Sequence, residues 1–85
     1  MRIDILSKPN ENCDYVERIV KIAAKTTNTE VQITRTSNFA AYSHCAINPS
    51  QTPIVIINGS VEFAGKVLEL EAVKKRLAEI NRLGY

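Results

Sequence analysis

The stretch ILSKPNENCDYV, residues 5–16, contains the side chain with the most chemical potential, the thiol of Cys13. A short apolar run ends at Leu6, polar and turn-forming residues follow, and Cys13 then opens an amphipathic segment. A thiol at a strand-to-helix junction can act as a nucleophile, because the positive end of the helix dipole stabilises the thiolate. In a dithiol site a second cysteine stands three residues earlier, but Asn10 occupies that position. Cys13 is therefore a candidate for single-thiol chemistry, or else a small core side chain.

The charges around Cys13 do not favour a reactive thiolate. Glu11 and Asp14 place negative charge on both sides of it, and Lys8 is the only nearby cation in the sequence. An exchange cycle within one motif is excluded at this position, because such a cycle needs two cysteines. Any redox role of Cys13 would therefore be of the monothiol type.

The second cysteine, Cys45, follows His44 and allows two further interpretations. It is a distant disulfide partner of Cys13 only if the two Cα atoms lie within about 7 Å of each other. Together with Cys13, His44 and Cys45 supply three potential zinc ligands, but they lack the close paired spacing of a structural zinc site. We predict that Cys45 packs at the end of a helix, and that the protein holds no metal and no cofactor.

Length and charge narrow the function classes. The 85 residues make one domain, spanning 1–85, with no room for a second core. The net charge of +2 is too small to indicate nucleic-acid binding. No apolar run approaches the roughly 18 residues of a membrane span, and two cysteines do not make a disulfide framework. We expect a monomer in the reducing cytoplasm, with no nucleic-acid or membrane partner.

The elements that position Cys13 follow from the spacing of apolar residues. The run IDIL, residues 3–6, predicts a short and mostly buried strand. From Cys13 onward, apolar residues recur at i, i+3 and i+4, which predicts a helix packed on one face. Its expected inward residues are Tyr15, Val16, Ile19, Val20, Ala23 and Ala24. Alternation of apolar and polar residues then predicts a half-exposed strand over residues 30–35.

The second half of the chain predicts a short helix, a hairpin and a longer helix. The short helix spans about residues 38–45, and its expected inner residues are Phe39, Tyr42 and Ala46. The apolar strand IVII ends at Asn58-Gly59, the strongest two-residue hairpin signal, and SVEFA returns as its partner. The last helix ends at Gly84, and its expected inward residues are Leu70, Val73, Leu77 and Ile80.

The predicted order β-α-β-α-β-β-α belongs to the α/β class. A strand-helix-strand opening implies a parallel pair joined by a right-handed crossover. The hairpin adds an antiparallel pair to the same sheet. The expected result is a mixed four-stranded sheet covered by helices.

The order of the predicted strands and helices, together with the residues that connect them, resembles the thioredoxin fold over nearly the whole chain. Three features carry the resemblance: the strand, turn, cysteine and helix of residues 3–25, Thr52-Pro53 directly before IVII, and NGSVEFAGK before the last helix. The chain is most similar to the very short archaeal and bacterial thioredoxin- and glutaredoxin-like proteins. The resemblance implies the strand order 2-1-3-4, with the first and third helices on one face. It also implies a cis peptide bond before Pro53, and a groove where the backbone of Thr52 pairs with an extended substrate segment.

Two registers relate Cys13 to the family pattern CxxC. In the gapless register NENC overlies CxxC, so Asn10 replaces the exposed attacking cysteine and Cys13 is the inner one. In a glutaredoxin-like register Cys13 is the attacker of CxYC, the second thiol is lost at Val16, and the loop carries two inserted residues. We prefer the gapless register, because it needs no insertion in the loop that positions the thiol.

The resemblance leads to two hypotheses for function. The first is a thioredoxin- or glutaredoxin-like protein with a degenerate site, in which Cys13 forms mixed disulfides with a protein or small-molecule thiol. The second is a redox-inactive module that binds a protein partner through the groove beside Thr52-Pro53. The site residues of these hypotheses are Cys13 as the catalytic thiol, with Asn10, Thr52 and Pro53 in binding.

Overall fold

The computed structural model describes residues 1–45, 47–65 and 68–83. The elements are β1 (Arg2–Leu6), α1 (Asp14–Thr26), β2 (Gln32–Thr36), the 3-10 helices η1 (Phe39–Tyr42) and η2 (Pro49–Gln51), β3 (Ile54–Ile57), β4 (Ser60–Ala64) and α2 (Leu70–Arg82). The strands form one sheet in the order β2-β1-β3-β4, with β1 and β2 parallel and the other pairs antiparallel. The predicted α/β class and strand order are confirmed.

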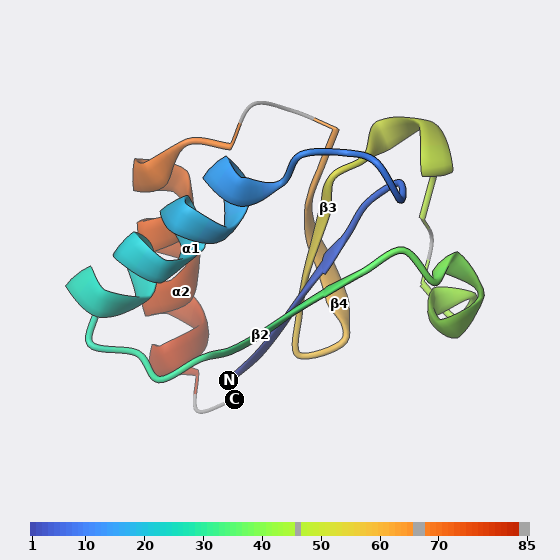
Figure 1. Cartoon of the computed structure of the whole chain (residues 1–85). Helices are drawn as coiled ribbons and strands as arrows, with labels where there is room; N and C mark the ends of the chain where they lie inside the picture. Colours follow the sequence, from blue (N-terminus) through green and yellow to red (C-terminus); the bar gives the residue numbers. More distant parts are fainter. Residues whose placement is uncertain (46, 66–67, 84–85) are drawn as a thin grey trace.

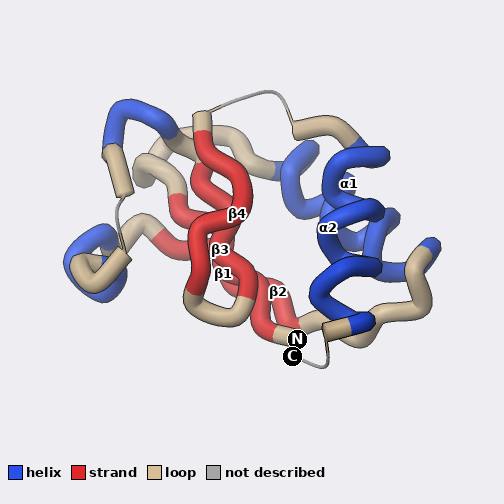
Figure 2. The backbone as a smooth tube through the Cα atoms, turned by 180° about the vertical axis from the view of Figure 1, so that it is seen from behind, coloured by secondary structure: helices blue, strands red, loops and turns tan. Residues whose placement is uncertain are grey.

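The sheet separates two unequal layers. Figure 1 shows α1 and α2 together on one face of the sheet, and the short green and yellow-green helical segments on the other. Figure 2 shows the same separation from behind. The α1 crossover joins the parallel strands β1 and β2 across the helix-covered face. The helices therefore lie on the predicted faces.

Side-chain alternation along the strands divides the interior into two cores. The larger core lies under α1 and α2 and contains Ile3, Ile5, Cys13, Val16, Val20, Ala23, Ala24, Val55, Ile57, Leu68, Val73, Leu77 and Ile80. The smaller core lies on the opposite face and contains Leu6, Tyr42, Ile54 and Ile56. Because β1 and β3 are covered on both faces, their sequences are nearly continuous apolar runs rather than alternating ones.

The turn between β3 and β4 explains why this hairpin was predictable. Asn58 has φ 49° and Gly59 has φ 86°, so both central residues occupy the left-handed region. Two positive φ values define the turn type whose twist matches the flanking strands, and asparagine followed by glycine adopts it at least cost. The turn fixes the register in which Ile57 pairs with Ser60.

The helix α1 begins one residue later than predicted, at Asp14. Cys13 occupies the N-cap position without a side-chain capping bond, and the carboxamide oxygen of Asn12 accepts a hydrogen bond from the Asp14 backbone N–H at 3.0 Å. Asn12 thus satisfies one of the free N–H groups at the helix start. Acidic side chains in the first turn, Asp14 and Glu17, suit the positive end of the dipole.

Several local predictions need correction. The helix expected over 38–45 is the single 3-10 turn η1, since Ser43, His44 and Cys45 are weak helix formers and do not extend it. Tyr15 was expected to face inward, but it is 39% exposed because it lies at the edge of the buried stripe of α1. The strand expected over 30–35 is β2, which begins two residues later and ends one residue later than predicted, at Gln32–Thr36. The predictions that involve Ala46, Lys66 and Gly84 lie outside the described residues.

Candidate functional site

The predicted site residues come from loops at one end of the sheet. Leu6, the last residue of β1, pairs with Ile54 at the start of β3 and with Thr36 at the end of β2. The backbone N–H of Ser7 then donates to the Thr36 carbonyl at 3.0 Å. The loop that carries Asn10 and Cys13 and the segment that precedes β3 therefore leave the same edge, as Figure 1 shows for the blue and yellow segments.

Asn10 lies at the tip of a closed turn. The N–H of Glu11 donates to the Lys8 carbonyl at 3.0 Å, and the Glu11 carboxylate accepts from the Lys8 N–H at 3.1 Å. This reciprocal pair fixes the loop and leaves the Asn10 side chain exposed. The position that the gapless register assigns to an attacking cysteine is thus open to solvent, and it carries an amide instead of a thiol.

Cys13 is a core residue. Its side chain is 0% exposed and belongs to the larger core, next in the chain to the first turn of α1. Its thiol is free. A disulfide exchange partner must reach the sulfur along a defined line, so this thiol cannot be attacked while the core is closed.

Next to Cys13, a series of ion pairs links β2 to the first two turns of α1. Arg35 Nη1 lies 2.9 Å from Asp14 Oδ1 and 3.8 Å from Glu17 Oε1, and Lys21 Nζ lies 2.9 Å from Glu17 Oε2. The hydrogen bond that Arg35 donates to the Asp14 carboxylate raises the pKa of Arg35 above its ordinary value, and the carboxylate charges of Asp14 and Glu17 add to this. Sequence reasoning considered only Lys8 and missed Arg35. The predicted parallel pairing could have found it, since the C-terminal end of β2 lies beside the start of α1.

Thr52 and Pro53 form the second half of the site. The peptide bond between them is cis, Thr52 is extended with φ −83° and ψ 154°, and both residues are half-buried. The Pro53 carbonyl accepts a hydrogen bond from the Gly65 N–H at 3.4 Å. Within residues 1–45, 47–65 and 68–83, neither the N–H nor the C=O of Thr52 takes part in a hydrogen bond.

Gly65 allows the close approach of β4 to this segment. Its φ is 67°, and a Cβ built on it would lie 2.9 Å from the Cβ of Gln51. Both the backbone conformation and the available space therefore require glycine. The residue places the end of β4 directly against the end of η2, one residue before Thr52.

Cys45 and His44 lie away from this site. The Cys45 thiol donates to the Gly59 carbonyl at 3.5 Å, near the β3–β4 turn at the opposite end of the sheet. Both cysteines are free, so the structure contains no disulfide between Cys13 and Cys45. The two thiols do not form one site.

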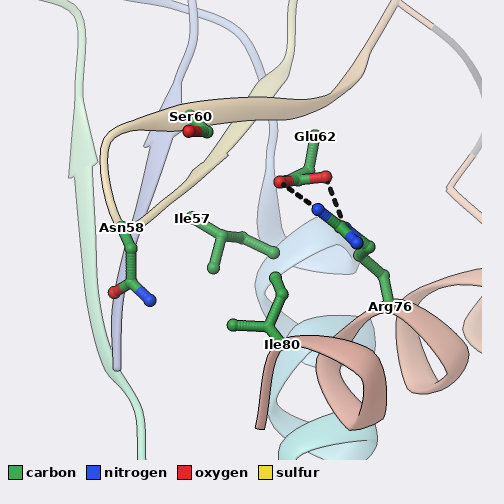
Figure 3. Close-up of a pocket in the computed structure, with 6 residues that line it drawn as sticks. All are labelled: Ile57, Asn58, Ser60, Glu62, Arg76 and Ile80. Carbon is green, nitrogen blue, oxygen red and sulfur yellow. Dashed lines mark hydrogen bonds and ion pairs between the residues drawn. The ribbon is translucent and has the colours of Figure 1, made fainter. Parts of the chain in front are cut away.

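A small cavity between the hairpin and α2 is structural. Figure 3 shows the Arg76 guanidinium pointing at both carboxylate oxygens of Glu62, at 2.7 and 3.1 Å, above Ile57 and Ile80. The cavity has a volume of about 60 Å³. Ligand pockets measure roughly 300–1,000 Å³, and a water occupies about 30 Å³ of liquid, so this space suits only a few waters.

Comparisons with known proteins agree with the geometry. Residues 1–78 match the family model of the thioredoxin domain. The searches of curated proteins and of solved structures returned no match. In the described part of the chain, neither helix is long and apolar enough to cross a membrane. The family match covers most of the chain and agrees with the observed sheet order, so the chain belongs to the thioredoxin domain family.

Proposed function

We propose that this protein binds an extended segment of a partner protein at Thr52-Pro53, in the manner of a thioredoxin-fold module whose thiol chemistry is lost. The observation that carries the proposal is the open backbone of Thr52, which is extended, half-buried and free of hydrogen bonds within the described residues. A backbone donor and acceptor that the described chain does not pair are available to an added strand. An added strand supplies both partners at once, which is the basis of β-strand addition.

The surroundings of Thr52 support the same proposal. On one side, Gly65 holds the adjacent Pro53 in place, so the segment is preorganised. On the other, the loop of Lys8 and Asn10 leaves the same edge of the sheet and presents an exposed amide. Asn10 can donate and accept hydrogen bonds with a bound backbone, whereas a cysteine there would form a covalent link.

A peptide selected from a random linear library on the wild-type protein provides the probe for this proposal. Titration of the synthetic peptide, followed by amide NMR, should shift resonances of Lys8, Asn10, Thr52 and Gly65. Thr52→Pro removes the backbone N–H of residue 52. The native φ of −83° is close to the φ that proline imposes, so the backbone there should keep its conformation. We expect it to weaken binding on the order of tenfold.

Thr52→Ala is the matched control, because it removes the side chain and keeps the backbone donor. It should bind the peptide about as well as the wild type. Equal binding by Thr52→Pro, or shifts confined to other faces of the molecule, would overturn the proposal.

A second candidate function, monothiol exchange through Cys13, is favoured by one observation. Cys13 stands at the N-terminal end of α1, and Arg35 pairs with Asp14, the residue next to it in the first turn of that helix. In such a step the Cys13 sulfur bonds to one sulfur of a disulfide, and the other sulfur leaves as a thiolate. The step requires the core around Cys13 to open.

Exposure to glutathione disulfide separates the two functions. We expect the half-buried Cys45 to form a mixed disulfide under native conditions, while the fully buried Cys13 reacts only after denaturation. The variant Cys45→Ser isolates the Cys13 reaction for mass spectrometry. Native modification of Cys13 at the rate of a free thiol would favour exchange over the binding module.

A further inference from the structure

A second pocket lies on the opposite face of the sheet, at the end away from Cys13. It is enclosed by the start of β1, the end of η1 and the β3–β4 turn, and its volume is about 420 Å³. Its lining includes Arg2, Asp4, Tyr42, His44, Asn58 and Gly59. The volume falls within the range of small-molecule pockets, roughly 300–1,000 Å³.

The polar centre of this pocket is a buried carboxylate that orients an arginine. Asp4 is only 3% exposed, and Arg2 Nε lies 3.3 Å from its Oδ1 and 3.2 Å from its Oδ2. Both contacts to the carboxylate run through Nε. The Tyr42 hydroxyl also interacts with the guanidinium, but the two terminal amino groups carry four N–H donors and retain capacity for another acceptor. A guanidinium held in this way presents the planar fork that matches a carboxylate.

The remaining walls add a further donor and two ring faces. The Asn58 side-chain oxygen already accepts a hydrogen bond from the backbone N–H of Arg2 at 3.0 Å, so the Asn58 NH₂ group is the part left for a ligand. The rings of Tyr42 and His44 are stacked, with their centroids 6.4 Å apart and their planes inclined by 24°, and both rings line the pocket. The Cys45–Gly59 hydrogen bond joins the segment after η1 to the turn, so these two walls are held together.

The groups around the pocket also limit which ligand it suits. Asp4 is the one carboxylate that lines it among the described residues, and its charge is balanced by Arg2. A ligand cation would meet the Arg2 charge, whereas a carboxylate finds donors on Arg2 and Asn58. We propose that this pocket binds a small organic acid, with its carboxylate on the terminal amino groups of Arg2 and its planar, apolar body along the rings of Tyr42 and His44.

Benzoate is the probe for this site, and benzamide is its uncharged counterpart of the same shape. In amide NMR titrations, benzoate should give saturable shifts at Arg2, Asp4, Tyr42, His44 and Gly59. Benzamide should bind far more weakly. Inorganic phosphate tests charge without an apolar body and should also bind more weakly than benzoate.

Arg2→Lys keeps a cation beside Asp4 and removes the fork, so the fold should persist while benzoate affinity falls on the order of tenfold. Arg18→Lys makes the same change on an exposed position of α1 and should leave the affinity unchanged. If benzamide binds as tightly as benzoate, apolar contact alone accounts for the affinity. If phosphate binds as tightly as benzoate, charge alone accounts for it. Either result, or an unaltered affinity in Arg2→Lys, would overturn the proposal.

Discussion

At the scale of single residues, the surroundings of Cys13 and Asn10 decide what this end of the fold can do. The pattern of the sequence placed both near the start of the first helix; in the structure Cys13 is the N-cap of α1, and Asn10 lies in the turn before it. The sequence did not reveal that Cys13 is completely buried, because burial depends on helices and strands that pack from elsewhere in the chain. It also did not reveal Arg35, whose position depends on the pairing of β2 with β1.

Restoring a cysteine at Asn10 tests the gapless register. Asn10 lies in the exposed turn before Cys13, so Asn10→Cys should place two sulfurs within disulfide reach at the start of α1. We expect a 10–13 disulfide after mild oxidation, mapped by mass spectrometry. Val16→Cys is the equivalent repair in the other register. A ready 13–16 disulfide without a 10–13 disulfide would show that the glutaredoxin-like alignment is the right one.

Tyr42 should make stability depend on alkaline pH. Burial raises the pKa of Tyr42 above its ordinary value, the Asp4 carboxylate adds to the rise, and Arg2 opposes it. The folded state therefore holds the phenol proton more tightly than the unfolded state. Its stabilising contribution is fully present below the unfolded value of about 10, and is lost as the pH rises through the folded value.

The measurement is the free energy of unfolding in urea at pH values from about 9 upward. Tyr42→Phe should reduce the alkaline fall in stability, because the residue that titrates is gone. Tyr15→Phe removes an exposed phenol and should leave the fall unchanged. An equal effect of the two substitutions would contradict this account.

At the scale of elements, the predictable parts are those with strong local signals. The helix α1 shows a clear repeat of apolar residues, and the β3–β4 hairpin has Asn58-Gly59 at its turn. The segment between β2 and β3 was predicted less well. Its 3-10 helices are too short for a periodic pattern, and η1 packs on the sheet through the single buried side chain of Tyr42.

Two glycines at the ends of β4 offer a matched test of local packing. Both have positive φ, so alanine should cost about 1 kcal/mol of backbone strain at either position. Gly59 has no atom within 4 Å of an added Cβ, whereas at Gly65 the Cβ would lie 2.9 Å from that of Gln51. Overpacking costs a further amount of about 1–3 kcal/mol.

We therefore expect Gly65→Ala to lower the free energy of unfolding clearly more than Gly59→Ala, as measured by urea denaturation. Gly65→Ala should also weaken peptide binding, since Gly65 holds the Pro53 carbonyl. Equal destabilisation by the two variants would mean that the segment before Pro53 moves to accept the methyl group.

At the scale of the whole molecule, stability rests mainly on the larger core. A chain of 85 residues, at roughly 0.05–0.15 kcal/mol per residue, has a total stability of about 4–13 kcal/mol. Leu77 on α2 is 0% exposed within that core, and truncating such a leucine to alanine costs about 2–5 kcal/mol. Leu77→Ala should therefore remove a large share of the total.

Leu83→Ala is the control at the end of the same helix, where the leucine is 64% exposed. Its effect should stay within about 0.5 kcal/mol. Thermal and urea unfolding of both variants would measure the difference. Similar losses in the two would show that α2 contributes to stability by some means other than packing on the sheet.

The unequal size of the two cores has a consequence for which parts of the protein exchange their amide hydrogens. The strands β1 and β3 contribute to both cores, so their amides should exchange with solvent only when the whole chain unfolds. The helix η1 packs on the smaller core alone, through Phe39 and Tyr42, and η2 buries no side chain, so the amides of both should exchange through an opening of that face that leaves the sheet intact. Because η2 leads directly into Thr52, a partner that pairs with Thr52 should slow amide exchange in η2 as well. The free energy of binding would then add to the free energy that is needed to open η2.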